Sequence, residues 1–231
     1  ICSAAKALSE GQFGQFPLYA FTSEGVWALE VSSTGTYSAK QPITRDVCIN
    51  PDGITQLDSA VLFPTDRGIM LISGSQTQCI SEAINSEYPF DALRLPGFDK
   101  LHTMLGHEPA TDKCLPTLPF TEFLKQCRML YDYVHQRVIV YAPGITYAYV
   151  FSLKTNQWGM MFSNIASHLN SYPDALAMDT KNAVLNFSVP VTDTVKCLYV
   201  TRPLKLEAAN VLKTVASVIQ RGLFRKGNVS T

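Results

Sequence analysis

Short apolar runs separated by polar turns recur along this sequence and restrict the folds open to it. Each run is about four to six residues long, the length of a short β-strand. Six of them occupy the first 80 residues, at positions 16–21, 26–31, 54–57, 60–63, 69–72 and 77–80. The intervening turns contain Gly25, Gly35, Gly68 and Gly74, and glycine supplies the positive φ that a tight hairpin requires. The pattern predicts antiparallel hairpins in series.

The hairpins repeat along the chain. The string TSEGVWAL at residues 22–29 aligns with TDRGIMLI at residues 65–72, and Gly25 and Gly68 are 43 residues apart. A step of this length is typical of one blade of a β-propeller. Each such blade is a four-stranded antiparallel meander, and stacking the blades buries both faces of each sheet.

A second pair of aligned segments has a similar spacing. Asp132 and the run at 138–141 align with Asp179 and the run at 184–187, and Val138 and Val184 are 46 residues apart. We therefore expect an all-β fold, a propeller-like array of four-stranded blades within a single domain over residues 1–231. About four blades of roughly 45 residues fit this length, and the sequence leaves open whether they close.

The string YAYVFSLKTNQW at residues 147–158 has the strand, polar turn and closing tryptophan of a kelch-type blade. A large ring at the start of a strand suits the wedge between two sheets. We expect Trp158 to pack between neighbouring blades rather than to hold a ligand, and Trp27 to do the same.

Residues 81–126 interrupt the repeat. They are rich in proline, which cannot donate to a strand ladder, and we interpret them as an insertion between blades. Two stretches within it, 98–105 and 119–125, predict short helices. Residues 206–220 place apolar side chains at helical spacing, yet their β-branched pairs suit a strand equally, so both remain open.

The amino-acid composition excludes some classes of function and favours others. Equal numbers of acidic and basic residues give zero net charge, which leaves no electrostatic footprint for sequence-specific nucleic-acid binding. Only 16% of residues are charged, against roughly 25% in an average domain, so part of the surface is expected to meet another protein. No apolar stretch reaches the roughly 20 residues that span a bilayer. The start at Ile1 predicts a fragment of a longer protein, and the six scattered cysteines predict free thiols.

No constellation predicts catalysis, a cofactor or a metal. His102 and His107 stand beside Glu108 but lack a further ligand at metal spacing, and His135 falls in a turn where polar residues are ordinary. Asp46 and Asp66 neighbour arginines, yet each is more simply a residue at a turn or strand end. We expect a protein that is not an enzyme.

Several strings together carry a family resemblance. They are GQFPLYAFTSEGVWAL (14–29), RDVC (45–48), TDRGIM (65–70), YDYVHQR (131–137), QWGMM (157–161) and RPLK (202–205). The sequence resembles phage and prophage structural proteins of gut bacteria, related to the propeller-like stabilisation proteins that plug the tail of short-tailed phages. The resemblance implies a virion component at the head-to-tail junction or tail hub, present in the host cytoplasm during assembly. Its partners would be other virion proteins or further copies in a ring, and it brings no catalytic residues.

The insertion is the candidate contact surface of such an assembly, because aromatic and aliphatic side chains supply interface energy. Its candidate interface residues are Tyr88, Phe90, Phe98, Leu101, His102 and His107.

Two alternatives stay open. In a carbohydrate-binding or carbohydrate-cleaving propeller, Trp27, Tyr37 and Tyr149 would stack on sugar rings beside paired carboxylates. A kelch-like bacterial interaction domain would instead form a closed propeller within this chain.

Overall fold

The computed structural model describes residues 1–3, 17–31, 35–39, 42–85, 116–170 and 172–189. The chain divides into two compact units, Ile1–Pro190 and Val191–Thr231, and the second unit lies outside the described residues. Strands β1 to β16 all belong to the first unit. The expectation of a single domain over residues 1–231 stays a prediction.

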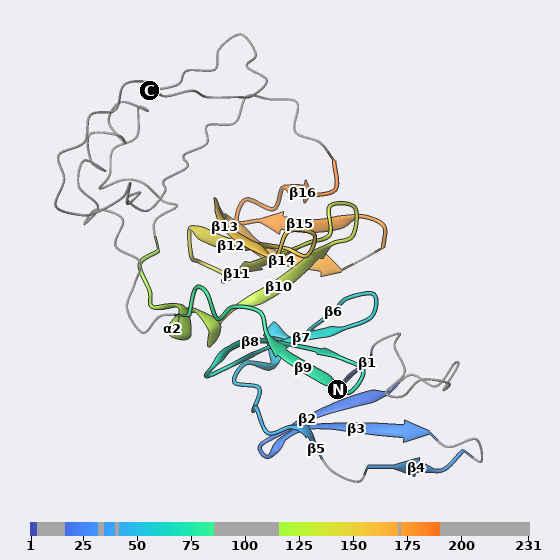
Figure 1. Cartoon of the computed structure of the whole chain (residues 1–231). Helices are drawn as coiled ribbons and strands as arrows, with labels where there is room; N and C mark the ends of the chain where they lie inside the picture. Colours follow the sequence, from blue (N-terminus) through green and yellow to red (C-terminus); the bar gives the residue numbers. More distant parts are fainter. Residues whose placement is uncertain (4–16, 32–34, 40–41, 86–115, 171, 190–231) are drawn as a thin grey trace, which may run out of the picture. The chain divides into compact units, whose positions relative to one another are not determined.

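The described strands form four sheets, which we number in chain order (Figure 1). Sheet 1 contains β1 (Cys2–Ser3), β2 (Leu18–Thr22), β3 (Gly25–Val31), β4 (Tyr37–Ser38) and β5 (Pro42–Thr44). Sheet 2 contains β6 (Thr55–Gln56), β7 (Val61–Thr65), β8 (Gly68–Ser73) and β9 (Gln76–Cys79). Sheet 3 contains β10 (Arg128–Asp132), β11 (Arg137–Tyr141), β12 (Tyr147–Ser152) and β13 (Gln157–Phe162). Sheet 4 contains β14 (Ile165–Asn170), β15 (Ala175–Asp179) and β16 (Val184–Asn186).

Every sheet is antiparallel, and its strands pair in sequence order except for β5 of sheet 1. In sheet 1 both β4 and β5 pair with β3, β4 near its end and β5 near its start. Among the described residues, two short helices accompany the sheets, the 3₁₀ turn η1 (Pro51–Gly53) and the α-helix α2 (Phe120–Leu124). The all-β prediction is confirmed, as are the six strands expected within the first 80 residues.

The 43-residue repeat is confirmed in atomic detail. The turns β2–β3 and β7–β8 each join the second and third strands of their sheets. In each turn the threonine hydroxyl, Thr22 or Thr65, donates to the carbonyl of the glycine three residues later, at 3.0 and 2.8 Å. Gly25 and Gly68 have φ of +125° and +126°, which only glycine adopts without strain. The equivalence therefore extends from sequence to hydrogen bonds and backbone angles.

The prediction that segments 46 residues apart occupy equivalent positions in two blades is wrong. Asp132 and Asp179 each end a strand and each accept backbone N–H groups of the following turn. However, Asp132 precedes the turn between the first and second strands of sheet 3. Asp179 precedes the turn between the second and third strands of sheet 4. The match reflects the turn chemistry of aspartate, which recurs wherever its carboxylate can accept the turn's N–H groups.

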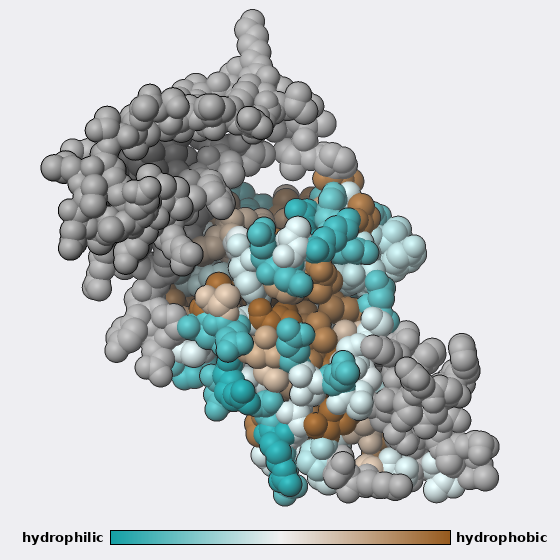
Figure 2. All heavy atoms as spheres, in the orientation of Figure 1, coloured by the Kyte–Doolittle hydropathy of each residue, from teal (hydrophilic) through white to brown (hydrophobic). Residues whose placement is uncertain are grey.

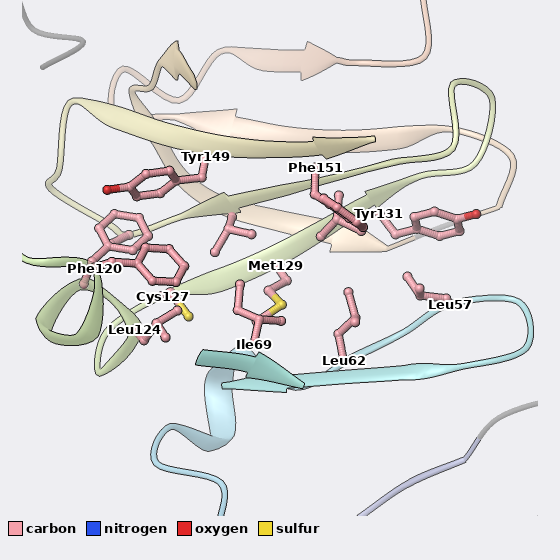
Figure 3. Close-up of a cluster of buried hydrophobic side chains, with 14 of the residues drawn as sticks. Leu57, Leu62, Ile69, Phe120, Leu124, Cys127, Met129, Tyr131, Tyr149 and Phe151 are labelled. Carbon is pink, nitrogen blue, oxygen red and sulfur yellow. The ribbon is translucent and has the colours of Figure 1, made fainter. Parts of the chain in front are cut away.

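Alternate residues along the strands bury both faces of sheets 2 and 3. In β7, Val61 and Phe63 pack against Tyr19 of sheet 1, while Leu62 packs toward sheet 3. Figure 3 shows Leu62 and Ile69 of sheet 2 opposite Met129 of sheet 3. A third cluster lies between sheets 3 and 4 and includes Leu130, Ile139, Tyr141, Ile165 and Ala177. The four sheets therefore stack in chain order on three apolar layers.

The first strands of successive sheets are neighbours, because β1 contacts β6, β6 contacts β10 and β10 contacts β14. Helix α2 contributes the buried side chains of Phe120, Phe123 and Leu124 to the layer between sheets 2 and 3. Phe123 packs on Tyr147 and Tyr149 of β12, with ring centroids 5.5 and 5.1 Å apart. The helix thus widens this layer beyond what the strands alone would fill.

Both ends of the predicted insertion at 81–126 belong to the core of the sheets. Ser81 is buried and its hydroxyl accepts the N–H of Ile69, and residues 120–124 belong to the core through α2. The helix expected at 119–125 is confirmed. Residues 86–115, including the stretch at 98–105, and residues 206–220 lie outside the described residues.

Four cysteines fall within the described residues, and all four are free thiols, as expected. They are Cys2, Cys48, Cys79 and Cys127, of which only Cys127 is fully buried. Burial raises the pKa of the Cys127 thiol to about 12. It therefore packs as a small apolar side chain rather than as a reactive thiolate.

Gly68→Ala tests the close packing of the repeated turn. At Gly68 a Cβ would contact Ser81 Oγ and the Asn85 amide, whereas at Gly144 (φ +82°) it would meet nothing within 4 Å. Gly68→Ala should lower the free energy of unfolding by about 2 kcal/mol. Gly144→Ala should lower it by about 1 kcal/mol, since only the backbone strain applies. Urea denaturation followed by circular dichroism measures both, and equal losses would contradict the packing argument.

Candidate functional site

An aromatic pocket lies where sheets 2 and 3 meet. Trp158, the second residue of β13, donates its indole N–H to the carbonyl of Ile80, which follows β9, at 2.9 Å. Its ring packs on Phe151 and Phe120, with centroids 4.8 and 6.3 Å away. The prediction that Trp158 packs between neighbouring sheets is confirmed. The exposed side of the same ring forms one wall of the pocket.

The pocket has a volume of about 400 Å³ and mostly apolar walls. The residues that define it are Ile84, Leu118, Phe120, Tyr149, Trp158 and Met160. None of its described lining residues carries a charge, and its one amide, Asn85, is already bonded to Ser81 and Arg67. Such a pocket can hold an apolar group, and none of its described lining residues is a carboxylate, histidine, lysine or cysteine.

A second hollow adjoins the pocket at Ala83 and has a volume of about 490 Å³. Glu82 is the only carboxylate among its described lining residues, which otherwise include Leu71, Cys79 and Phe151. Hydrolysis of a glycosidic bond requires two carboxyl groups that face each other across the substrate. This hollow does not present that pair.

The outer face of sheet 4, which points away from sheet 3, exposes apolar side chains within the described part of the chain, beside the polar Ser167 and Asn186. Leu169 pairs with Leu176, and Met178 pairs with Val184, so these four side chains share one face. Leu169, Met178 and Val184 are 60%, 37% and 74% exposed. Brown hydrophobic residues also interrupt the teal surface over the middle of the described part (Figure 2). An exposed apolar sheet face of this kind is a candidate interaction surface.

The outer face of sheet 1 is also apolar. The pairs Leu18–Leu29 and Ala20–Trp27 stand on the face opposite Tyr19 and therefore point away from sheet 2. All four residues are half-buried. Trp27 is thus not wedged in the layer between sheets 1 and 2, in contrast to Trp158.

The carboxylates considered as catalytic candidates have structural partners. Arg67 in the β7–β8 turn donates to Asp46 at 3.0 Å, and the Thr44 hydroxyl donates to the same carboxylate at 2.7 Å. This ion pair joins the end of sheet 1 to sheet 2. Asp66 and Arg45 are exposed, and neither forms a cation–carboxylate pair among the contacts described. The interpretation of these residues as turn and strand-end residues is confirmed.

Asp132 is the most buried carboxylate of the described residues, and its partners bridge sheets 3 and 4. It accepts hydrogen bonds from Arg137 Nε at 2.8 Å and from the Ser188 hydroxyl at 3.3 Å, and His135 Nδ1 lies 2.7 Å away. Arg137 also donates to the carbonyl of Phe187. Burial alone would raise the pKa of Asp132, but the hydrogen bonds of His135 and Arg137 outweigh it and lower the pKa. The group stabilises the turn and provides no free base.

The structure also carries polar bridges that the sequence did not reveal. Asn50 donates to the carbonyls of Leu124 and Cys127, and Asn170 donates to Thr55 and accepts the N–H of Tyr131. Asn50 is buried and connects the segment before η1 to α2 and to the residue before β10, whereas Asn170 is an exposed residue of β14 that connects sheet 4 to β10 and to β6. Only the Asn50–Pro51 dipeptide, which caps η1, gave any signal of a special position.

The predicted interface residues Tyr88, Phe90, Phe98, Leu101, His102 and His107 lie outside the described residues. Within the described ranges, no group of three or more His, Cys, Asp or Glu side chains is placed to hold a metal ion. In that same part of the chain, no helix is long and apolar enough to cross a membrane.

The aromatic set proposed for sugar stacking is not assembled as expected. Tyr149 is only 7% exposed, belongs to the core between sheets 2 and 3, and burial raises its pKa. Trp27 lies in sheet 1, and the side chain of Tyr37 is outside what the structure describes. Tyr149 therefore cannot stack face-on against a sugar ring, because aromatic rings of Phe120 and Phe123 already contact it.

Comparisons with known proteins leave the family open. No protein-family model matches the sequence, and no curated protein matches it.

Asp132→Asn tests the bridge between sheets 3 and 4. At pH 7 the variant should lose about 2 kcal/mol of unfolding free energy, because Arg137 loses its buried anionic partner. The folded-state pKa of Asp132 is lowered, so this stabilisation is present above the unfolded pKa of about 4 and disappears as pH falls through the folded value. Denaturation at several pH values should show the variant and the parent converging in acid.

Asp179→Asn is the matched control, because Asp179 also ends a strand before a turn but accepts from backbone N–H groups and the Asn164 amide. Asp179→Asn should lower the free energy of unfolding by about 1 kcal/mol. A difference between Asp132→Asn and the parent that stays constant down to pH 3 would contradict the role given to the Asp132 charge.

Proposed function

We propose that this chain is a non-enzymatic structural protein that acts through protein–protein contacts. The observation that carries the proposal is the exposure of apolar side chains on the outer face of sheet 4, where Leu169 and Val184 are 60% and 74% exposed within the described part of the chain. Monomeric proteins keep such faces covered, and proteins that function within assemblies use them as contacts. The described hollows supply no catalytic pair, which agrees with this class.

A propeller-like arrangement is part of the proposal. Four meanders that follow one another in the chain, with their first strands adjacent, are the arrangement expected of blades around an axis. A closed kelch-like domain would bury the outer faces of its first and last sheets on each other. The exposed face of sheet 4 favours an array completed by further contacts instead.

The setting we propose is a phage virion, at the head-to-tail junction or in the tail hub. This rests on the family resemblance of the strings at 14–29, 65–70 and 131–137, of which the first two form the repeated hairpins of sheets 1 and 2. A stack of sheets with apolar ends suits a component that must fit between other subunits. Its partners would be other virion proteins or copies of itself, assembled in the host cytoplasm.

The carbohydrate alternative has weaker support. It required exposed aromatic rings beside paired carboxylates, whereas Tyr149 is buried and Glu82 stands alone in its hollow. Genes for portal, terminase and capsid proteins beside this gene would support the virion role, and sugar-uptake genes would favour the alternative.

Mass spectrometry of purified particles tests the virion role. Phage particles released from a host whose genome encodes this chain are banded on a density gradient and digested. Peptides of this chain should band together with capsid peptides, while an abundant host cytoplasmic protein serves as the negative control. Peptides that remain with the host proteins at the top of the gradient would contradict a virion component.

A further inference from the structure

The repeat assigns a packing role to the outer face of sheet 1. A shift of 43 residues places Leu18, Ala20, Trp27 and Leu29 at the positions of Val61, Phe63, Met70 and Ile72 in sheet 2. Those four residues of sheet 2 form the face that packs on the preceding sheet, sheet 1. The outer face of sheet 1 is therefore built, position by position, like a face that receives a preceding sheet.

The outer face of sheet 4 corresponds to the faces of sheets 1, 2 and 3 that pack on the sheet that follows. Sheets 1, 2 and 3 each bury one face against the sheet that follows, in the three core clusters. Sheet 4 has the same apolar character on its outer face but no described sheet follows it. Within the described residues, the stack therefore ends at one side in the outer face of sheet 1 and at the other in the outer face of sheet 4, whose apolar side chains are exposed.

We propose that the outer face of sheet 4 in one copy of this chain packs on the outer face of sheet 1 in a second copy. The inference rests on the proposed function as an assembly protein and names the partner of the same surface. The contact continues the layers between sheets 1 and 2, 2 and 3, and 3 and 4, with Val184 and Leu169 taking the place of core residues. Zero net charge removes long-range repulsion between copies.

Such a contact is heterologous, because two different surfaces of the chain meet. Repetition of one heterologous contact generates a ring when the rotation closes and a filament when it does not. An isologous dimer, in which two sheet 4 faces meet, would stop at two copies. Mixtures of variants separate these arrangements.

The test uses the 231-residue chain in sedimentation equilibrium. Val184→Asp places a charge on the sheet 4 face at a 74% exposed position, and Leu29→Glu places one on the sheet 1 face. Lys154→Glu in the exposed β12–β13 turn is the control. The parent and the control should form oligomers, and each face variant should weaken association at least about 100-fold. Circular dichroism confirms folding, and Leu18→Glu replaces Leu29→Glu if the latter unfolds.

An equimolar mixture of Val184→Asp and Leu29→Glu should form a complex of two chains and no larger species. One chain retains an intact sheet 1 face and the other retains an intact sheet 4 face, so a single heterologous contact forms. Self-association of Leu29→Glu alone with loss only in Val184→Asp would overturn the inference in favour of an isologous dimer. A monomeric parent would also overturn it.

The two proposals fail separately. A monomeric parent whose peptides band with virions refutes the contact between copies alone. An oligomeric parent whose peptides stay out of the particles refutes the virion role alone.

Discussion

Burial of both faces of a sheet against its neighbours is the interaction that holds this protein together. Sheet 2 illustrates it, because Val61 and Phe63 enter one apolar layer while Leu62 enters the other. A short meander is marginally stable alone and gains stability by packing an apolar face on a neighbour, so each sheet packs on the next. The charged fraction of 16% follows from this arrangement, since few strand positions remain for charged side chains.

Polar groups within the stack act as connectors between the layers. The Asp46–Arg67 pair, the Asn50 amide and the Asp132 carboxylate each join neighbouring sheets. They fix how one sheet sits on the next, which apolar contacts alone specify loosely. Asp46, which the sequence offered as a carboxylate candidate, is thus held by Arg67 and Thr44 at such a connection. The surfaces left for function are the aromatic pocket beside Trp158 and the two ends of the stack.

The sequence correctly predicts those features that arise from interactions between residues close together in the chain. Thr-x-x-Gly turns specify their hairpins through a hydroxyl and a positive φ, and Trp158 follows from its place after a polar turn. The aspartate series misled because Asp132 and Asp179 cap different turns with the same local chemistry. Asn50, Asn170 and the core role of α2 depend on contacts between segments that are far apart in the chain, and no local pattern encodes them.

Hydrogen exchange of the 231-residue chain, followed by mass spectrometry of its peptides at a concentration where it is monomeric, tests mutual burial of the sheets most directly. Amides open in cooperative units whose protection follows the burial around them. If burial of both faces stabilises the sheets, we expect the strongest protection in β7, β8, β11 and β12, whose sheets are covered on both faces, and weaker protection in β15 of sheet 4. Protection in β15 equal to or greater than that in β8 and β11 would contradict it.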